Sequence, residues 1–189
     1  MSLSNQIKEY CNVKYKSIKV FRNEIEITVE KENLFKMVQF LKDNPSCLFD
    51  QLSDITAVDY PSKKNRYIII YQFLSVTNNQ RVRLLCPIKS DDVIPSVSKL
   101  YLSALWSERE LWDMFGIYID GHPDLRRILT DYGFQGHPLR KDFPLTGFDE
   151  VSYEAESRKV VYNKVKLTQD YRDFDFNSPW GAETIEDNK

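Results

Sequence analysis

Near the N-terminus the hydrophobic residues recur first with the period of a strand and then with the spacing of a helix. Ile25, Ile27 and Val29 alternate with polar residues, as in a strand with one buried face. Four apolar residues then follow at the spacing of one helix face: Leu34, Met37, Val38 and Leu41. We expect Asn33 to cap this helix and the Asn-Pro pair at 44–45 to end it, because the residue before a proline disfavours the helical conformation.

Three further runs are rich in β-branched and aromatic residues, which is typical of strands. They lie at 55–60, 67–76 and 81–88. Residues 67–71 are apolar at every position, so we expect their strand to be a central one. After these strands, apolar residues at helical spacing predict a helix over 96–105.

A second short helix is predicted over 108–115. Ser107 and Glu110 have the spacing of a capping box, in which each side chain binds a backbone N–H near the helix start. Gly116 fits the left-handed position that often follows a helix end.

The chain changes character after residue 120, where glycine and proline recur too often for regular elements. Residues 142–189 carry eleven acidic and six basic side chains, yet also eight aromatic residues, in which disordered tails are poor. We therefore predict an α+β fold, with a small mixed β-sheet domain and two or three helices at 1–120. Residues 121–189 are predicted to be a loop-rich motif segment and a long, extended, irregular C-terminal arm on a partner. The alternative is a tail that folds back over its own domain.

Composition excludes several classes of protein. The 189 residues include 26 basic and 28 acidic side chains, so the chain lacks the positive excess of a nucleic-acid-binding protein. No apolar run approaches the ~20 residues of a membrane span, and we expect no secretory or import peptide. The three cysteines form no CxxC pair, and no nucleotide-binding or metalloprotease motif occurs. We expect no catalytic, cofactor-binding or metal-binding residue in this chain.

Four charged residues crowd onto the second predicted helix: Glu108, Arg109, Glu110 and Asp113. Neighbouring carboxylates can serve as acid and base, because each shifts the pKa of the other. The structural alternative is an ion pair between Arg109 and Asp113, which lie four residues apart. We favour an interface or ion-pair role over catalysis.

An approximate repeat follows this helix: Gly-His-Pro-Asp-Leu-Arg-Arg at 121–127 and Gly-His-Pro-Leu-Arg-Lys at 136–141. Arg127 and Arg140 suit bidentate contacts with carboxylates, so we expect them to fix a rigid loop against a partner and to support assembly. The two histidines, His122 and His137, have no third and fourth ligand at recognisable spacing, so no metal site is predicted.

These residues carry a resemblance. Glu-Arg-Glu-Leu-Trp-Asp-Met-Phe-Gly at 108–116, His-Pro-Asp-Leu-Arg-Arg-Ile-Leu at 122–129 and the continuation through 145 resemble the 30 kDa subunit of respiratory complex I, also called NADH dehydrogenase subunit 9. The resemblance resumes in Tyr-Arg-Asp-Phe-Asp-Phe-Asn-Ser-Pro-Trp at 171–180. The motif residues that we expect at a subunit interface are Glu108, Arg109, Glu110, Asp113, His122, Arg126, Arg127, Asp131, His137, Arg140, Lys141 and Trp180.

The resemblance implies a core subunit of the quinone-reducing module of NADH:ubiquinone oxidoreductase, which couples electron transfer from NADH to ubiquinone to proton translocation. It implies that FMN, the iron–sulfur clusters, NADH and ubiquinone bind to other subunits. The main implied partner is the forty-nine-kilodalton subunit of complex I, which helps to form the quinone cavity and is here called the quinone-cavity subunit. Other peripheral-arm subunits are implied as further partners, with no nucleic acid and with membrane association only through the complex.

The location is predicted from the amino-acid composition. Lys, Ile and Asn, which AT-rich codons favour, total 41 residues, against 28 for Gly, Ala, Arg and Pro. We hypothesise a mitochondrially encoded subunit on the matrix side of the inner membrane. A bacterial subunit on the cytoplasmic face of the membrane is the alternative.

Three rival functions differ in what they require. An equivalent subunit of a photosynthetic NDH complex or a membrane-bound hydrogenase would differ only in its partners' redox centres. A stand-alone hydrolase would use Glu108, Asp113 and His122 and would show a strongly shifted pKa. A nucleic-acid adaptor would bind phosphates through its basic residues: Arg126, Arg127, Arg140 and Lys141.

Overall fold

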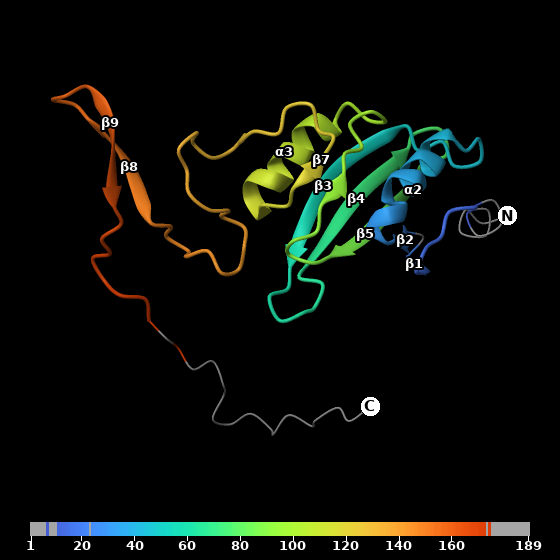
Figure 1. The fold of residues 1–189 in the computed structure, drawn as a ribbon, viewed down its shortest axis with the longest axis horizontal. Coiled ribbons are helices and arrows are strands. Elements are labelled where there is room, and N and C mark those ends of the chain that lie inside the picture. Colours follow the sequence, from blue (N-terminus) through green and yellow to red (C-terminus); the bar gives the residue numbers. More distant parts are fainter. Residues whose placement is uncertain (1–6, 8–10, 23, 173, 175–189) are drawn as a thin grey trace, which may run out of the picture. The chain divides into compact units, whose positions relative to one another are not determined.

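The computed structural model of the chain describes Ile7, residues 11–22 and 24–172, and Phe174 (Figure 1). The chain forms two compact units, Met1–Leu145 and Thr146–Lys189. The sequence placed a division at residue 120, whereas in the structure residues 121–145 belong to the first unit. No helix among the described residues is long and apolar enough to cross a membrane.

A five-stranded mixed sheet forms the centre of the first unit, with the strand order β1-β2-β5-β4-β3. Its strands are β1 (Ser17–Phe21), β2 (Glu24–Thr28), β3 (Gln51–Asp59), β4 (Tyr67–Ser75) and β5 (Gln80–Ile88). All neighbours are antiparallel except β2 and β5, which are parallel. The predicted strands are confirmed, and β4 is flanked on both sides as expected. β1 is an edge strand that the sequence pattern did not predict.

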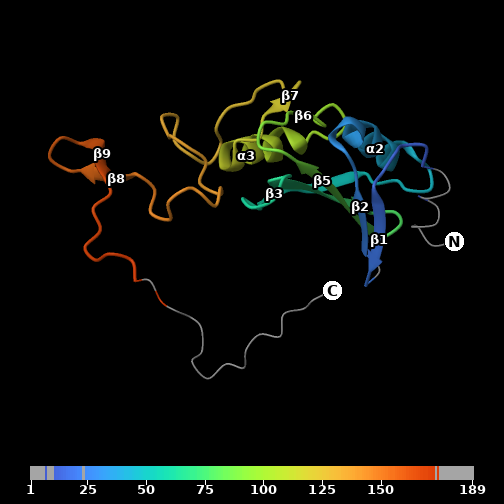
Figure 2. The same ribbon diagram turned by 60° about the horizontal axis from the view of Figure 1, so that its bottom comes forward.

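Two helices lie on the same side of this sheet, α2 (Lys31–Asp43) and α3 (Ala104–Phe115) (Figure 2). The four predicted apolar positions of α2 are all fully buried: Leu34, Met37, Val38 and Leu41. The prediction that Asn33 caps α2 is wrong, because the helix begins two residues earlier and the Asn33 N–H already bonds the Glu30 carbonyl. The helix ends at Asp43, and Asn44, before the proline, is its extended C-cap, as the Asn-Pro pair predicts.

The predicted helix over 96–105 is wrong: residues 96–103 form turns, and only 104–105 are helical, as the start of α3. The turns follow β6 (Ile94–Pro95), which pairs in parallel with β7 (Ile119–Asp120). Bonds from side chains stabilise these turns, where a helix would use its regular series of backbone hydrogen bonds. The Glu108 carboxylate accepts the Val97 N–H at 2.7 Å, and the Tyr101 hydroxyl donates to the Phe49 carbonyl at 2.5 Å.

The predicted capping box is also wrong. Since α3 already begins at Ala104, Ser107 lies inside the helix. Ser103 precedes the helix, and its hydroxyl donates to the Leu52 carbonyl at 3.0 Å. Gly116 does end α3 in the left-handed conformation, with φ 73°, as predicted.

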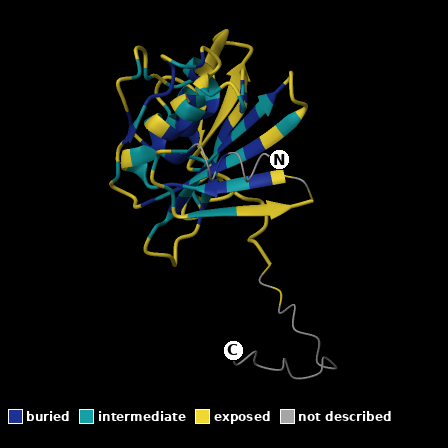
Figure 3. Cartoon of the chain, turned by 90° about the vertical axis from the view of Figure 1, so that its right-hand side faces the viewer, coloured by how far each residue is buried: buried dark blue, intermediate teal, exposed yellow. Residues whose placement is uncertain are grey.

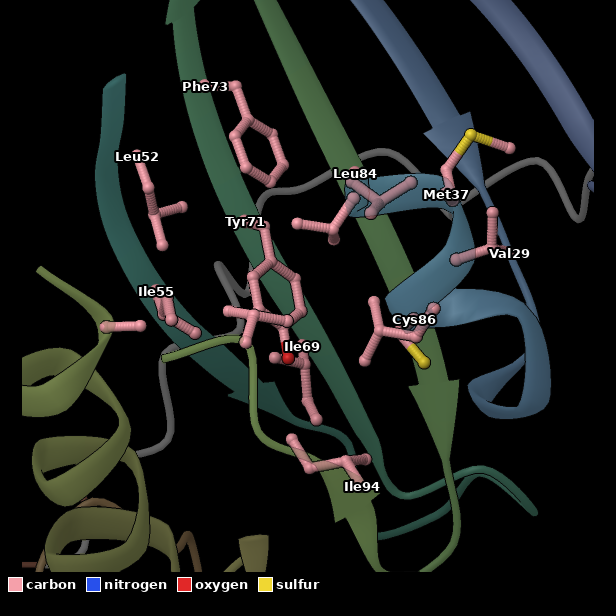
Figure 4. Close-up of a cluster of buried hydrophobic side chains, with 14 of the residues drawn as sticks. Val29, Met37, Leu52, Ile55, Ile69, Tyr71, Phe73, Leu84, Cys86 and Ile94 are labelled. Atoms are coloured by element: carbon pink, nitrogen blue, oxygen red, sulfur yellow. The ribbon is translucent and has the colours of Figure 1, made fainter. Parts of the chain in front are cut away.

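The core lies between the helices and one face of the sheet, where alternate residues of β2, β5, β4 and β3 are buried (Figure 3). Figure 4 shows Tyr71 among Ile55, Ile69 and Leu84 at the centre of this layer. Tyr71 is fully buried, and its hydroxyl has no hydrogen-bond partner among the described residues. Burial raises the pKa of Tyr71 well above its ordinary value.

We expect Tyr71→Phe to leave the free energy of unfolding unchanged or to raise it by up to about 1 kcal/mol, because the substitution removes an unsatisfied buried hydroxyl. Tyr101→Phe is the matched control and should lower the free energy of unfolding by about 1 kcal/mol, because it leaves the buried Phe49 carbonyl unbonded. Urea unfolding of the full chain measures both. A larger loss for Tyr71→Phe than for Tyr101→Phe would contradict this expectation.

The second unit contains an antiparallel hairpin, β8 (Asp149–Glu154) and β9 (Lys159–Lys164) (Figure 1). The sequence predicted irregular structure here, which is wrong for these residues. Valine and tyrosine alternate with polar residues over 149–154, and a β-branched and aromatic run follows at 160–162, so this pattern could have identified the hairpin. The described aromatic residues Tyr153, Tyr162 and Tyr171 are all exposed. Trp180 and most of the 171–180 run lie outside the described residues.

Candidate functional site

The segment 121–145, here called the motif loop, is attached to α3 through one buried carboxylate. Asp113 Oδ2 accepts the backbone N–H groups of Ile128, Leu129 and Thr130 at 3.0, 2.8 and 3.0 Å. Its Oδ1 accepts the Arg127 guanidinium at 2.7 Å and the Thr130 hydroxyl at 2.6 Å. The Asp113 side chain is fully buried, so these five bonds replace its hydration.

The hydrogen bonds determine the charge state of Asp113. Burial alone would raise the pKa of this carboxyl. The hydroxyl and backbone donors of Thr130 and the N–H groups of Leu129 and Ile128 outweigh burial, and the pKa lies well below its ordinary value. Asp113 is therefore ionised at neutral pH and forms an ion pair with Arg127.

Arg127 and Arg109 hold the loop from two sides. Arg127 also donates to the Gly136 carbonyl at 3.0 Å and lies over the rings of Trp112 and Phe134, 5.6 Å from each centroid. Arg109 donates to the Arg126 and Arg127 carbonyls at 3.1 and 2.9 Å. The predicted ion pair between Arg109 and Asp113 is therefore not the observed one: the partner of Asp113 is Arg127, which is remote in sequence.

The second repeat caps the C-terminal end of α3. The last carbonyls of a helix lack partners within the helix. Here His137 Nδ1–H donates to the Asp113 carbonyl at 2.9 Å, the Leu139 N–H to the Met114 carbonyl at 3.0 Å, and Arg140 Nε–H to the Phe115 carbonyl at 2.6 Å. Burial lowers the pKa of His137.

Arg127 and Arg140 were expected to bind carboxylates of a partner. In the structure, Arg127 binds a carboxylate of its own chain and Arg140 binds a backbone carbonyl, and their contact with a partner stays a prediction. Both arginines thus fix the loop from within the chain.

Glu108 lies in a separate buried cluster. Its Oε1 accepts the Val97 N–H and its Oε2 accepts the Ser96 hydroxyl, both at 2.7 Å. His122 Nδ1 accepts the Asp124 N–H at 3.1 Å, so Nε2 carries the proton and faces the Leu105 carbonyl at 3.2 Å. Burial raises the pKa of Glu108.

The shifted pKa values of Glu108 and Asp113 match one requirement of the hydrolase alternative, but both carboxylates are fully buried and hydrogen-bonded within the chain. This arrangement supports a structural role for both. The described residues contain no group of three or more His, Cys, Asp or Glu side chains that could hold a metal ion.

A contact that sequence reasoning missed joins the end of the motif loop to the sheet. Arg66 makes two bonds of 2.8 Å to the Asp59 carboxylate and a third, of 3.0 Å, to Asp142. Asp59 Oδ2 also accepts the Lys141 N–H at 2.9 Å. Asp59 and Lys141 are 82 positions apart, so no local pattern could have indicated this contact.

The outward side of the motif loop is partly apolar. Four large side chains are exposed: Leu129 at 64%, Tyr132 at 88%, Leu139 at 49% and Leu145 at 88%. Of the predicted interface residues that the structure describes, those that are also exposed are Glu110, Arg126, Asp131 and Lys141. Arg126 pairs with Asp124 at 2.8 Å, and Arg127 and Arg140 point into the chain, which does not favour the nucleic-acid alternative.

The sequence of the motif loop and of most of the sheet matches a known protein family. The sequence model described as "Respiratory-chain NADH dehydrogenase, 30 Kd subunit" matches residues 27–149. The chain belongs to this family. The predicted resemblance to the 30 kDa subunit is thereby confirmed.

Curated relatives agree with the family assignment. The C subunit of NADH-quinone oxidoreductase from Ruegeria pomeroyi is 55% identical over 163 residues, which are 86% of this chain and 82% of that protein. The corresponding protein of Dinoroseobacter shibae, which has the same name, is 51% identical over 170 residues, 89% of this chain and 79% of that protein. These names do not favour the alternative of a photosynthetic or hydrogenase complex.

A solved structure shares the fold of this chain. A chain in the structure of the membrane-bound sulfane sulfur reductase, an archaeal respiratory membrane complex, matches with a TM-score of 0.60 and 24% identity. The match covers 76% of this chain and 84% of that one. At this identity the likeness supports the α+β fold and no shared activity.

Proposed function

We propose that the chain is a core structural subunit of NADH:ubiquinone oxidoreductase and that the motif loop is its docking surface for the quinone-cavity subunit. One observation carries the proposal. Hydrogen bonds attach the motif loop to α3: Arg127 bonds the Asp113 carboxylate, and Arg140 bonds the Phe115 carbonyl. The outward side of the loop carries large exposed apolar side chains. A rigid base with exposed Leu and Tyr side chains suits a permanent protein–protein contact, because little conformational entropy is lost on binding.

Family membership supports the wider role. The relatives are named as subunits of NADH-quinone oxidoreductase, so partners among the other subunits of such a complex are expected. In this proposal FMN, the iron–sulfur clusters, NADH and ubiquinone bind elsewhere, and this chain positions its neighbours for electron transfer coupled to proton translocation.

The location of the complex is part of the proposal. The named relatives are bacterial, which favours the cytoplasmic face of a bacterial membrane over the mitochondrial matrix. They give no support to the mitochondrial hypothesis. Membrane association would come through other subunits of the complex.

The test removes the outward side chains and leaves the anchors in place. We expect the double substitution Leu129→Ser, Tyr132→Ser to lower the abundance of the assembled complex severalfold and to leave the NADH:quinone activity per assembled complex unchanged. The stability of the isolated chain should change by less than about 1 kcal/mol, because both side chains are exposed. Val76→Ser, at an exposed apolar position beyond the far end of β4, is the control and should leave abundance unchanged.

Native gels, activity per complex and a photo-crosslinking residue at position 132 provide the measurements. The crosslink should join the quinone-cavity subunit. Normal abundance with lost activity would show a direct part in the chemistry and would contradict a purely structural role. Normal abundance with normal activity, or a crosslink to another subunit, would contradict the assignment of this surface.

A further inference from the structure

Two fully buried carboxyls on α3 have opposite surroundings. Asp113 accepts five hydrogen bonds, one of them from the Arg127 guanidinium. The Glu108 side chain is equally buried, but it accepts only two, from the Val97 N–H and the Ser96 hydroxyl. Among the residues that the structure describes, no lysine or arginine pairs with Glu108. An ionised Glu108 would therefore be a buried charge without a bonded cation, which is costly.

His122 is the titratable group of the motif loop that faces Glu108, but it does not neutralise the carboxyl. Its Nε2 lies 3.9 Å from Glu108 Oε2, beyond hydrogen-bond distance, and its Nε2–H donates to the Leu105 carbonyl at 3.2 Å. Its Nδ1 accepts the Asp124 N–H at 3.1 Å, so the imidazole is neutral. The His122 ring thus connects α3 to the first turn of the motif loop.

The remaining charged and titratable groups near this pair do not bond Glu108. They are Tyr71 on β4, Cys86 on β5, Arg109 on α3, and Asp124 and Arg126 in the motif loop. Burial raises the pKa of Tyr71 and of Cys86, so both are neutral at neutral pH. The two arginines bond a loop carbonyl and Asp124 instead. Burial outweighs the two hydrogen bonds that Glu108 accepts and raises its pKa.

The serine hydroxyls beside Glu108 can serve either charge state of the carboxyl. Glu108 Oε2, Ser96 Oγ and Ser98 Oγ form a chain with two links, each of 2.7 Å. With Glu108 ionised, both hydroxyls donate towards the carboxylate. With Glu108 protonated at Oε2, both links reverse, and Oε2–H donates to Ser96 Oγ. Ser96 Oγ accepts the Ser98 N–H at 3.1 Å in either case, so the cluster keeps its bonds when the proton comes or goes.

We propose that Glu108 is a proton switch: it holds a proton at neutral pH, and loss of that proton to solvent transfers the His122 Nε2–H from the Leu105 carbonyl to the new carboxylate. Nε2 lies 3.2 Å from the first acceptor and 3.9 Å from the second, so a small movement of the ring exchanges them. Because Nδ1 bonds the Asp124 N–H, this movement shifts the first turn of the motif loop. The switch consists of contacts within the chain and does not rest on the docking function proposed above.

Infrared difference spectra of full-length variants test the charge state. Glu108→Gln preserves the shape and bonding of a protonated carboxyl, because its amide oxygen accepts and its NH₂ group donates. At neutral pH, we expect the spectrum of the native chain minus that of Glu108→Gln to contain the carbonyl band of a protonated carboxyl. The matched controls on the same helix, Glu110→Gln and Asp113→Asn, should give carboxylate bands only. A carboxylate band for Glu108 at neutral pH would overturn the proposal.

The pH dependence of unfolding provides a second measurement. The pKa of Glu108 is higher in the folded chain, so the stability it contributes is complete below the unfolded pKa, about 4, and is lost as the pH rises towards the folded pKa. The unfolding equilibrium constant of the native chain, divided by that of Glu108→Gln, should therefore rise by about tenfold per pH unit from about pH 5 to 7. This sign is opposite to that for Asp113, whose pKa is lowered. A constant or falling ratio would overturn the proposal.

Nuclear magnetic resonance of the native chain tests the movement of His122 and needs no substitution. The side-chain carboxyl carbon of isotope-labelled Glu108 reports its ionisation above neutral pH. As that carbon titrates, the His122 Nε2–H and Asp124 amide signals should shift with the same midpoint. The only other histidine of the sequence, His137, bonds the opposite end of α3 and is the internal control. Unchanged His122 and Asp124 signals while Glu108 ionises, or the same shifts in Glu108→Gln, would overturn the switch.

Discussion

Gly116→Ala is expected to lower the free energy of unfolding by about 3–4 kcal/mol, the sum of backbone strain and lost capping bonds. Gly116 has φ 73°, a conformation in which a side chain costs about 1–2 kcal/mol. A Cβ at this position would also lie 2.2 Å from an Arg140 nitrogen and 2.6 Å from the His137 ring. Arg140 has a flexible end that can move, but the His137 ring is held by its bond to the Asp113 carbonyl. The motif loop must therefore shift, and its caps on α3 weaken.

Alanine substitutions at two other glycines separate the cost of backbone strain from the cost of steric contact with the new Cβ. Gly121 has φ 76° with no atom within 4 Å of a Cβ, so Gly121→Ala should cost about 1–2 kcal/mol for the backbone alone. Gly133 has neither constraint, and Gly133→Ala should change stability by less than about 1 kcal/mol. Urea unfolding of the three full-length variants gives the series. Equal losses for Gly116→Ala and Gly121→Ala would show that the close approach contributes nothing.

Asp113→Asn should lower the free energy of unfolding by about 3 kcal/mol at neutral pH, because it leaves the partly buried Arg127 guanidinium without its fully buried carboxylate partner. An asparagine also turns an NH₂ group towards N–H or guanidinium donors that need an acceptor. Glu110→Gln removes an exposed carboxylate from the same helix and should cost less than about 0.5 kcal/mol.

The pH dependence provides a second measurement for Asp113. The pKa of this carboxyl is lower in the folded chain than in the unfolded chain, so the stability it contributes is complete above the unfolded pKa, about 4. That contribution is lost as the pH falls from there towards the folded pKa. The difference in unfolding free energy between the native chain and Asp113→Asn should therefore be constant from about pH 5 to 7 and shrink below about pH 4. A difference that grows on acidification would contradict the assigned hydrogen bonds.

Local patterns in the sequence predicted the regular elements well and the site contacts poorly. The strands and α2 follow from periodicity, which reports which face of an element is buried. The partner of Asp113 could not be found in this way: a rule for residues four apart selects Arg109, whereas the structure selects Arg127 from a loop. Similarly, Val97 and Tyr101 have the spacing of a helix face but lie in turns. The buried Glu108 carboxylate and the Phe49 carbonyl stabilise these turns through hydrogen bonds.

The family motif shows the same limit. It singled out residues that the structure places in contacts within the chain, and the interface role that it indicated for them stays a prediction. Arg127, His137 and Arg140 were expected to face a partner, and each bonds a group on α3. Nothing in one sequence separates a residue that makes an interface from one that shapes the loop beside it, because both kinds of residue recur in the same short segment.

The parallel pairing of β2 with β5 has a consequence for synthesis of the chain. β3, β4 and β5 are consecutive antiparallel neighbours, each of which can pair as soon as the next strand is made. β2 pairs with β1 at once, but its other neighbour is β5, more than fifty residues later. During N-to-C synthesis the β1–β2 hairpin therefore waits with one edge open, and the sheet closes only when residue 88 has been made. β5 is thus the last strand of the sheet to be made, and it joins the early β1–β2 hairpin to the later strands β3 and β4.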